Sequence, residues 1–436
     1  MKAVNIGLIG LGTVGSGTLT VLKRNAQEIS RRAGREIRVI AAAVKDLSKQ
    51  RDVDTDGVYL TENMDEIVNH PDIEIVVELV GGGGRILDAV LAALDNGKHV
   101  VTANKALIAL HGNEIFHKAR EKGLVVAFES AVAGGIPIIK SIREGLSANR
   151  IEWLAGIING TSNYILTEMT QSGANFDDVL KDAQDLGYAE ADPTFDVEGI
   201  DAAHKLTILA SIAFGIPLQF ESVYAEGISG ITGEDITYAD ELGYRIKHIG
   251  IARSSESGIE LRVHPTLIPI SRLIANVNGV MNAVLVESDA VGPTLYYGAG
   301  AGSEPTASAV VADLVDVVRT ITTDPENRVP HLAFHNDTII DAPILDMSRV
   351  ETAYYLRMTV TNKPGVMASI ATIFGDSDIS IDSILQKGSG RKNDDVSIIM
   401  LTQNTLEGNL VKAVTRVEEL SSVKGSVVRI RLEQLS

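Results

Sequence analysis

The first 130 residues alternate short apolar runs with amphipathic segments, and this alternation constrains the fold more than any other feature of the chain. Runs of strand length are followed by segments with the 3.6-residue periodicity of helices. Such alternation predicts an α/β domain with a doubly wound parallel sheet, which binds ligands at the carboxyl ends of its strands. The expected strands are Val4–Ile9, Arg38–Val44, Ile73–Val80, His99–Thr102 and Leu124–Phe128, and the expected helices include Val14–Ile29, Ile86–Asn96 and Asn113–Lys122.

A glycine fingerprint, Gly10-Leu-Gly12-Thr13-Val14-Gly15, follows the first expected strand. Gly10 would permit a tight turn, Gly12 would let the backbone approach a pyrophosphate, and Gly15 would let the helix pack closely on the strand. The N-terminus of the next helix would add N–H donors for the phosphates. We therefore expect a Rossmann-type NAD(P)-binding domain over residues 1–130. A glycine-rich turn in a non-binding α/β domain is the alternative.

The choice of cofactor depends on the residues that follow the second strand, Lys45 and Asp46. An acidic side chain at the strand end would bind the 2′-hydroxyl of NAD(H), whereas a basic one would bind the 2′-phosphate of NADP(H). Lys45 favours NADP(H), and Asp46, which comes one residue late, leaves NAD(H) possible. The alternative for Lys45 is a solvated loop lysine.

Beyond residue 130, glycine and proline punctuate mixed helices and longer strands. We expect an α+β substrate-binding catalytic domain over residues 131–301, and a helix at about 302–322 that returns to pack on the first domain. Residues 323–350 are rich in Pro and Asp and indicate a linker. Residues 351–436 have the order βαββαβ of a ferredoxin-like unit, with a hairpin tip at Gly388–Asp395.

Composition excludes several classes of function. A length of 436 residues suggests two to three domains. The absence of cysteine excludes disulfides and thiolate chemistry. A net charge of −18 without a basic patch argues against nucleic acid as a partner. The N-terminus lacks a signal-peptide pattern and the apolar stretches are shorter than a membrane span, so we expect a cytoplasmic protein.

An acidic run between Ala183 and Lys205 contains the strongest candidates for chemistry. Asp201 and Lys205 are four residues apart, so they share one face of a helix. The following turns are apolar on nearly every side, which predicts a buried helix and therefore a buried Asp–Lys pair. A lysine in such a place could transfer protons. The alternative is a surface salt bridge, and His204 is interpreted as a packing residue.

Three further polar elements follow expected strands. Lys105, in the run Thr102-Ala-Asn104-Lys105, would face the cleft and could orient a carbonyl or carboxylate or touch the cofactor; a surface lysine at a helix start is the alternative. Glu129 opens a glycine-rich loop that carries the oxygens of a hard-cation site, although its residues alone favour a structural turn. The run Asn159-Gly-Thr-Ser-Asn163 could cap the next helix or line a substrate pocket.

These motifs, in this order, resemble the homoserine dehydrogenase family over almost the whole chain. The resemblance implies interconversion of L-aspartate 4-semialdehyde and L-homoserine, with Lys205 as the proton-transfer group and Lys105 in the active site. It assigns Gly187, Glu190 and Asp201 to the substrate, and it adds Gly302 to the residues near the nicotinamide. The matching loop of the family binds sodium, which implies Glu129 and the main-chain oxygens of Val132, Gly134 and Ile136 as ligands.

The C-terminal unit resembles an ACT domain, with Asn362-Lys-Pro364-Gly365 at its first strand–helix turn. This resemblance implies threonine as an allosteric effector in threonine and methionine biosynthesis, and a homodimer or homotetramer. A unit that only dimerises is the alternative for this domain. For the whole chain, the alternatives are another Rossmann dehydrogenase of an amino-acid semialdehyde and a non-catalytic sensor of nucleotides and amino acids.

Overall fold

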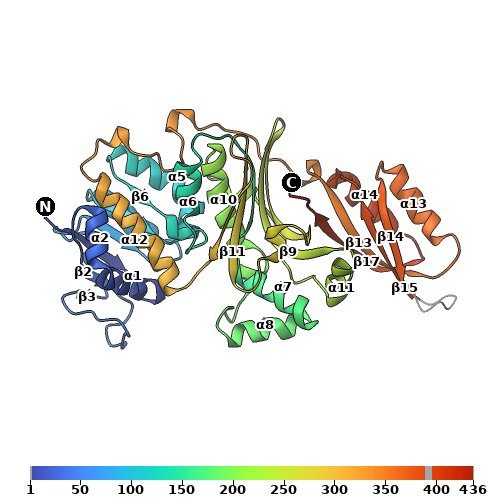
Figure 1. The fold of residues 1–436 in the computed structure, drawn as a ribbon, viewed down its shortest axis with the longest axis horizontal. Coiled ribbons are helices and arrows are strands. Elements are labelled where there is room, and N and C mark those ends of the chain that lie inside the picture. Colours follow the sequence, from blue (N-terminus) through green and yellow to red (C-terminus); the bar gives the residue numbers. More distant parts are fainter. Residues whose placement is uncertain (1, 388–394, 436) are drawn as a thin grey trace. The chain divides into compact units, whose positions relative to one another are not determined.

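A computed structural model describes residues 2–387 and 395–435 of the chain. Its contacts divide the chain into two compact units (Figure 1). Unit 1 comprises Met1–Gly160, Asp201–Val223 and Val280–Ala342, and unit 2 comprises Thr161–Ile200, Tyr224–Gly279 and Pro343–Ser436. These units join segments that are distant in the sequence, so the domain boundaries expected at 130, 301, 322 and 350 stay a prediction.

Unit 1 contains the predicted doubly wound sheet, which is parallel throughout and has the strand order β3-β2-β1-β4-β5-β6. The strands are β1 (Val4–Ile9), β2 (Ile37–Ala43), β3 (Tyr59–Thr61), β4 (Ile75–Glu78), β5 (His99–Thr102) and β6 (Val126–Ala127). The helices between them are α1 (Thr13–Arg24), α2 (Ala26–Ala33), α3 (Met64–Val68), α4 (Arg85–Asp95) and α5 (Lys105–Glu121). The single helix expected at Val14–Ile29 is wrong, because Asn25 leaves the helical conformation and separates α1 from α2.

Helix α12 (Ser303–Thr320) completes the core of this sheet from a distant part of the sequence. Its apolar side chains, among them Val310 and Leu314, are buried in one cluster with those of β1 and α1. Figure 1 shows α12 alongside α1. The two helices approach closely at Gly17, where a Cβ atom would lie 2.6 Å from the carbonyl oxygen of Ser303.

Unit 1 also holds a second, antiparallel set of strands, in which β11 pairs with both β7 and β12. Helix α10 begins at Ile200, and its part from Asp201 onward belongs to unit 1. The bounds are β7 (Ile151–Ile157), α6 (Ile138–Lys140), α10 (Ile200–Phe214), β11 (Met281–Ser288) and β12 (Thr294–Ala299).

Unit 2 is built on strands in the order β9-β10-β17-β13-β15-β14. Residues from β13 onward have the predicted ACT topology, β13 (Glu351–Thr361), α13 (Val366–Asp376), β14 (Ile381–Lys387), β15 (Asp395–Thr402), α14 (Glu407–Glu418) and β17 (Val423–Leu432), with the short β16 (Thr405–Leu406) added. The expected hairpin tip lies, except for Asp395, outside the described residues. The remaining elements are α7 (Gly160–Ser172), α8 (Phe176–Asp185), α9 (Thr194–Val197), β8 (Tyr224–Ala225), α11 (Gly233–Glu241), β9 (Tyr244–Ser255) and β10 (Gly258–Pro269).

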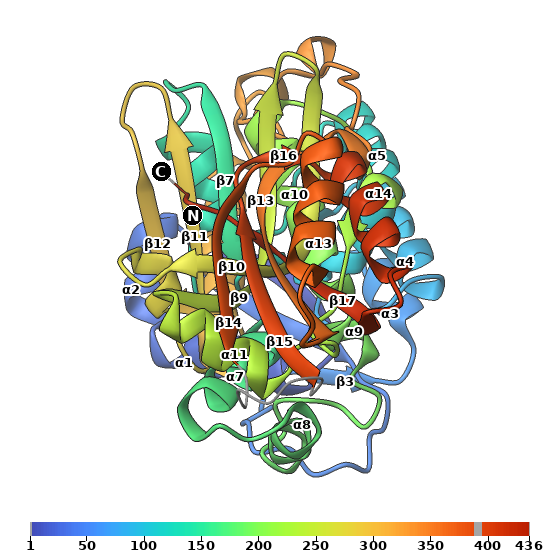
Figure 2. The same cartoon turned by 90° about the vertical axis from the view of Figure 1, so that its right-hand side faces the viewer.

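The ACT sheet is covered on both faces, as the alternation of its side chains requires. Tyr354, Leu356 and Met358 of β13 point to a cluster with α13 and α14, which lie side by side in Figure 2. Ala353 and Tyr355 point to the opposite cluster, which contains residues of α7, α8 and α11.

Buried ion pairs connect the ACT strands to β10 within unit 2. Arg262 of β10 is fully buried and donates to Glu433 at 2.6 Å and to Glu260 at 3.0 Å. Arg431 of β17 is bound to Glu407 of α14 and to Glu226. Elsewhere, no helix within the described residues combines the length and apolarity that a bilayer crossing requires.

Candidate active site

The glycine fingerprint forms the turn from β1 into α1, at the carboxyl edge of the parallel sheet. Gly10 has φ +100°, and its N–H donates to Ala43 O at 2.9 Å. A Cβ atom on Gly15 would lie 2.3 Å from Gly10 O, so only glycine fits there. A Cβ atom on Gly12 would meet nothing within 4 Å. Gly12 is therefore open to a ligand, and α1 begins at once with Thr13 and Val14.

Lys45 and Asp46 lie in the exposed loop after β2. The Asp46 carboxylate accepts from the N–H of Ser48 at 2.8 Å and from its hydroxyl at 2.6 Å, and these bonds to Ser48 lower the pKa of Asp46. The Asp46 carboxylate is thus bound within its own loop.

Gly302 caps the N-terminus of α12 with φ +128°. The next residue, Ser303, donates its hydroxyl to Thr13 O at 2.8 Å, so the start of α12 lies beside the fingerprint turn. The structure therefore brings Gly302 to the same edge of the sheet as Gly10 to Gly15.

Asp201 lies between two lysines that come from different helices. Its Oδ1 is 2.7 Å from Lys105 Nζ at the start of α5, and its Oδ2 is 2.7 Å from Lys205 Nζ on α10. Asn159 Nδ2 donates to Oδ2 at 2.8 Å, and Lys205 Nζ donates to Ile158 O at 2.7 Å. Asp201 is 2% exposed, and the Lys205 side chain 11%, so the predicted buried pair is confirmed.

The electrostatics of this cluster keep Asp201 ionised. Burial would raise the pKa of Asp201, but Lys205 and Lys105 outweigh burial and hold that pKa well below its usual range. Neighbouring His204 is packed against Phe220, with ring centroids 4.3 Å apart, and burial lowers its pKa to about 4. His204 is therefore neutral at physiological pH.

The loop from Glu129 to Ile136 is buried beside α12. Both oxygens of the Glu129 carboxylate accept backbone N–H groups of α6, from Ile139 and Lys140, each at 2.9 Å. Burial raises the pKa of Glu129 despite these bonds. Ile136 O accepts from Ile138 N–H at 2.7 Å, and Val132 and Gly134 lie in the same loop. Each of these oxygens keeps a second lone pair, which is compatible with a cation ligand.

Gly187 and Glu190 belong to unit 2. Gly187 has φ +76° in the turn after α8, and the exposed Glu190 is held through its main-chain oxygen, which accepts from Gln184 at 3.0 Å. Thr161 donates to Tyr188 O at 2.7 Å, so the start of α7 fixes this turn. The role of both residues in binding substrate stays a prediction.

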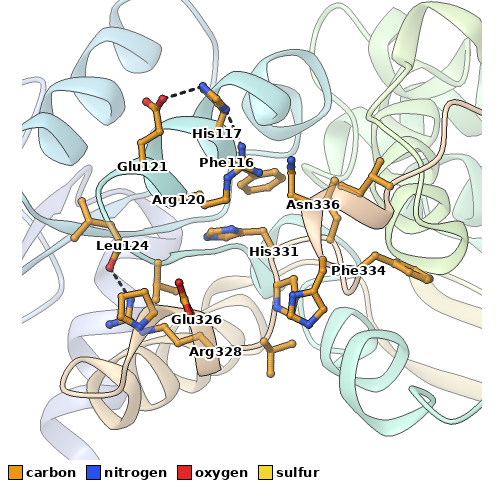
Figure 3. A pocket seen from close by; sticks show the side chains of 18 of the residues that line it. Phe116, His117, Arg120, Glu121, Leu124, Glu326, Arg328, His331, Phe334 and Asn336 are labelled. Carbon is orange, nitrogen blue, oxygen red and sulfur yellow. Dashed lines mark hydrogen bonds and ion pairs between the residues drawn. The ribbon is translucent and has the colours of Figure 1, made fainter.

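A hollow of about 1490 Å³ lies elsewhere in unit 1, between α5 and residues 324–339. Figure 3 shows His331 at its centre beside Phe116, with the two rings stacked at 5.0 Å. Five carboxylates and two arginines line it together with three histidines, and none of the predicted site residues does. This hollow is therefore separate from the predicted site residues.

Two buried polar residues, Asn159 and Glu78, make contacts that the sequence did not predict. Asn159 was expected in a capping or pocket-lining element, but not as a partner of Asp201. Glu78, at the end of β4, was not considered, although an acidic residue closing an apolar strand was a visible signal. Its carboxylate accepts from Thr102 Oγ1 at 2.6 Å.

Comparison with known proteins points to one family over most of the chain. The family model described as "Homoserine dehydrogenase, NAD binding domain" matches residues 10–129, "Homoserine dehydrogenase" matches 137–315, and "ACT domain" matches 354–421. The homoserine dehydrogenase of Pseudomonas aeruginosa is 63% identical over 436 residues, which cover 100% of both chains.

Solved structures give the same result. A crystal structure of a homoserine dehydrogenase from Thiobacillus denitrificans is 65% identical, with a TM-score of 0.96 over 100% of this chain and 99% of that one. A hyperthermophilic archaeal homoserine dehydrogenase in complex with NADPH is 27% identical, with a TM-score of 0.61 over 73% of this chain and 98% of that one.

Proposed function

The chain belongs to the homoserine dehydrogenase family, and from this premise we propose that Lys205, Asp201 and Lys105 form the catalytic centre of its NAD(P)-dependent oxidoreductase activity. The reaction interconverts L-aspartate 4-semialdehyde and L-homoserine, a step in amino-acid biosynthesis. The observation that carries the proposal is the buried carboxylate of Asp201 between two lysines at the carboxyl edge of the sheet.

In this proposal Lys205 moves the proton at the substrate oxygen. The bound nicotinamide supplies or takes the hydride. Lys205 Nζ gives a proton to the carbonyl oxygen during reduction and takes one from the hydroxyl during oxidation. Asp201 and Ile158 O fix the position of this ammonium, and Asp201 stabilises its charge. Lys105, which is half-buried, orients the carbonyl or the cofactor.

Substrate binding is assigned to Glu190 and Asp201, with Gly187 shaping the turn. Carboxylates suit the ammonium of an amino acid, and the ammonium groups of the two lysines suit its oxygens.

Variants of Lys205 test the proposal directly. Homoserine-dependent reduction of NADP, followed at 340 nm, should fall by about 100-fold or more in kcat for Lys205→Met, since general acid–base catalysis contributes on that order. The cofactor dissociation constant should stay the same. Near-normal kcat in the variant would remove Lys205 from this role, and absence of activity in the wild type would favour a sensor.

We propose a preference for NADP(H) over NAD(H), carried by Lys45. The support is the exposed position of Lys45 after β2 and the engagement of Asp46 by Ser48, together with the NADPH bound to the archaeal relative. Lys45→Ala should lower kcat/KM for NADP and leave that for NAD unchanged. Equal efficiency with both cofactors in the wild type would contradict the preference.

We also propose that Glu129 and the main-chain oxygens of Val132, Gly134 and Ile136 bind a monovalent cation such as sodium. Support comes from two buried carboxyl groups at this loop, Glu129 and Asp313, of which Asp313 Oδ2 accepts the N–H of Glu129 at 2.8 Å. Replacing sodium chloride by choline chloride at constant ionic strength should then lower activity and the unfolding temperature. No change in either would contradict the site.

Threonine is proposed as an effector of the ACT domain in a cytoplasmic homodimer or homotetramer. Gly365, with φ +92°, caps α13 and leaves backbone open at the expected ligand turn, and β14 forms the outer edge of the described sheet. Threonine should reduce activity in the assay above, and the molar mass from light scattering should be two or four times 46.5 kDa. A monomeric mass would contradict the proposed oligomer, and activity that threonine does not change would contradict the proposed effector.

A further inference from the structure

We propose that Glu78 is a positioning residue that couples the cofactor-binding loop after β4 to Lys105. The inference rests on the assignment of Lys105 and of the glycine fingerprint to the active site made above. Glu78 adds a buried carboxylate to that site. Its described hydrogen bonds involve neither Lys105 nor Lys205.

Glu78 closes β4 and is fully buried. Its register partner on β5 is Thr102, whose hydroxyl donates to Glu78 Oε2 at 2.6 Å. Burying a carboxylate is costly unless its oxygens accept hydrogen bonds. The chain nevertheless keeps this charge at the carboxyl edge of the sheet, which is where a doubly wound fold binds its ligand.

The second oxygen of Glu78 holds the loop that follows. Glu78 Oε1 accepts from the N–H groups of Val80 at 2.8 Å and Gly81 at 3.0 Å. The loop continues through four glycines, of which Gly81, Gly82 and Gly84 have positive φ. Glycine loses the most backbone freedom on ordering, so the shape of this loop depends on such fixed bonds.

This loop forms a wall beside the dinucleotide turn. A Cβ atom on Gly10 would lie 2.8 Å from Val80 Cγ2 and 3.1 Å from the carbonyl carbon of Leu79. The Leu79 N–H also donates to Ile9 O at 2.8 Å. A shift of Val80 would therefore change the space that the fingerprint offers to the cofactor.

The other branch of the network leads to Lys105. Thr102 Oγ1 accepts from Asn104 N–H at 3.0 Å, and Asn104 caps α5 by accepting from Leu107 N–H at 3.0 Å. The amide of Asn104 also donates to Gly82 O at 2.7 Å. The bonds thus close a ring from Glu78 through Thr102 and Asn104 back to the glycine loop.

Lys105 directly follows Asn104, and its ion pair with Asp201 is 2.7 Å long. One carboxylate therefore sets both the wall of the cofactor site and the start of the helix that presents Lys105. Removing it breaks three hydrogen bonds to a charged acceptor, and each such bond corresponds to about 10- to 100-fold in an equilibrium constant.

The test compares Glu78→Ala, Glu78→Gln and Thr102→Val in the full chain. Glu78→Ala should raise the dissociation constant of NADPH, measured by its fluorescence, by about 10-fold or more and lower kcat at saturating substrates as well. Thr102→Val breaks only the branch to Asn104, so it should lower kcat while the dissociation constant changes by less than about 3-fold. Glu78→Gln, which keeps an acceptor and the shape, should recover most of both quantities.

Thr61→Val is the matched control, because Thr61 closes β3 and accepts from Asn63 N–H at 3.1 Å in the same local turn, without a carboxylate. It should lower the unfolding temperature less than Thr102→Val, because no buried carboxylate loses a donor, and it should leave both functional quantities unchanged. Glu78→Ala with normal kinetics, even if less stable, overturns the proposal. If that variant does not fold, an unchanged kcat in Thr102→Val overturns it. If the wild-type protein did not oxidise homoserine, that result would instead count against the proposed function. The NADPH titration would still test whether Glu78 positions the loop after β4.

Discussion

Asp201 accepts three contacts from groups that lie far apart in the sequence, Lys105, Asn159 and Lys205. A carboxylate that is 2% exposed needs such partners, because an isolated buried charge is strongly unfavourable. The same contacts orient both lysines, so the stability of this cluster and its proposed function depend on one side chain.

Replacing Asp201 by Asn should therefore destabilise the protein far more than replacing Lys105 by Met. Asp201→Asn leaves the buried Lys205 without its counter-charge, and such losses cost about 3 to 5 kcal/mol. Lys105 is 35% exposed and its removal leaves the Asp201–Lys205 pair intact, so we expect less than about 1 kcal/mol. Urea unfolding followed by circular dichroism measures both, and equal losses would contradict this account.

The residues of this cluster could be predicted only in part. Asp201 and Lys205 are four apart on an apolar helix, so local spacing was enough to pair them. Lys105 and Asn159 join them through the tertiary fold, and a single sequence carries no signal for which distant amide or lysine reaches a given carboxylate. Glu78 carried a local signal, as an acidic residue that closes an apolar strand, but a single sequence does not show that Thr102 on the neighbouring strand donates to it.

Among the elements, the turn from β1 to α1 separates two roles of glycine. Gly15 is required by packing, since its Cβ atom would meet the backbone of Gly10, whereas Gly12 faces open space. The sequence predicted both roles from the position of the fingerprint. It did not predict the break at Asn25 or the three-residue strand β3, because short elements and helix ends are fixed by tertiary contacts more than by periodicity.

Substitution by alanine should lower the stability of the protein at Gly15 and weaken cofactor binding at Gly12. Gly15→Ala forces α1 away from the turn, and overpacking of this kind costs about 1 to 3 kcal/mol. Gly12→Ala should leave the unfolding temperature unchanged and weaken NADPH binding, because its methyl group occupies the approach of the pyrophosphate. Thermal unfolding and a fluorescence titration measure the two effects. A loss of stability in Gly12→Ala would show that the turn is tighter than described.

In the whole molecule, each unit is assembled from three separate segments. Alternation of strands and helices predicted the parallel sheet and the ACT topology, since both arise within contiguous stretches. It could not show that α10 joins unit 1 while the residues just before Asp201 belong to unit 2, because contacts between distant segments leave no local periodicity.

Unit 2 contains buried arginines whose replacement should lower the stability of the whole unit. Arg262→Met removes the fully buried partner of Glu433 and Glu260 and leaves them only the more exposed Arg253, so we expect a loss of about 3 kcal/mol. Arg416→Met is the matched control in the ACT domain, since Arg416 is 48% exposed and pairs with the exposed Asp376; we expect less than about 1 kcal/mol. Unfolding in urea measures both. An unchanged free energy of unfolding in Arg262→Met would mean that the buried ion pairs do not contribute to holding β10 to its neighbours.

Buried histidines make the protein sensitive to acid. Burial lowers the pKa of His99 from 6.5 to about 4, so its neutral form contributes stability above pH 6.5 that is lost as the pH falls toward 4. A shift from 6.5 to 4 corresponds to about 3 kcal/mol at the acid end. His204, His264 and His331 have lowered pKa values for the same reason and add to the loss.

Replacing His99 by Asn, which can still accept the N–H of Val125, should flatten the fall in unfolding temperature between pH 6.5 and 4.5. His117→Asn serves as the control, because the His117 side chain is 60% exposed and the slope should stay as in the wild type. Parallel curves for His99→Asn and the wild type would show that its protonation does not oppose folding.

Strand β17 lies between β10 and β13 although residues 423–432 follow both of them in the chain. A ribosome releases β10 and β13 before the strand that belongs between them, so the positions of both strands that pair with β17 stay unpaired while translation continues. Open strand edges of this kind attract other chains. Until β17 is made, these edges are therefore open to pairing with another chain. A chain truncated before residue 423 would expose the same edges. Exposed edges on β10 and β13 therefore distinguish an incomplete chain from a complete one.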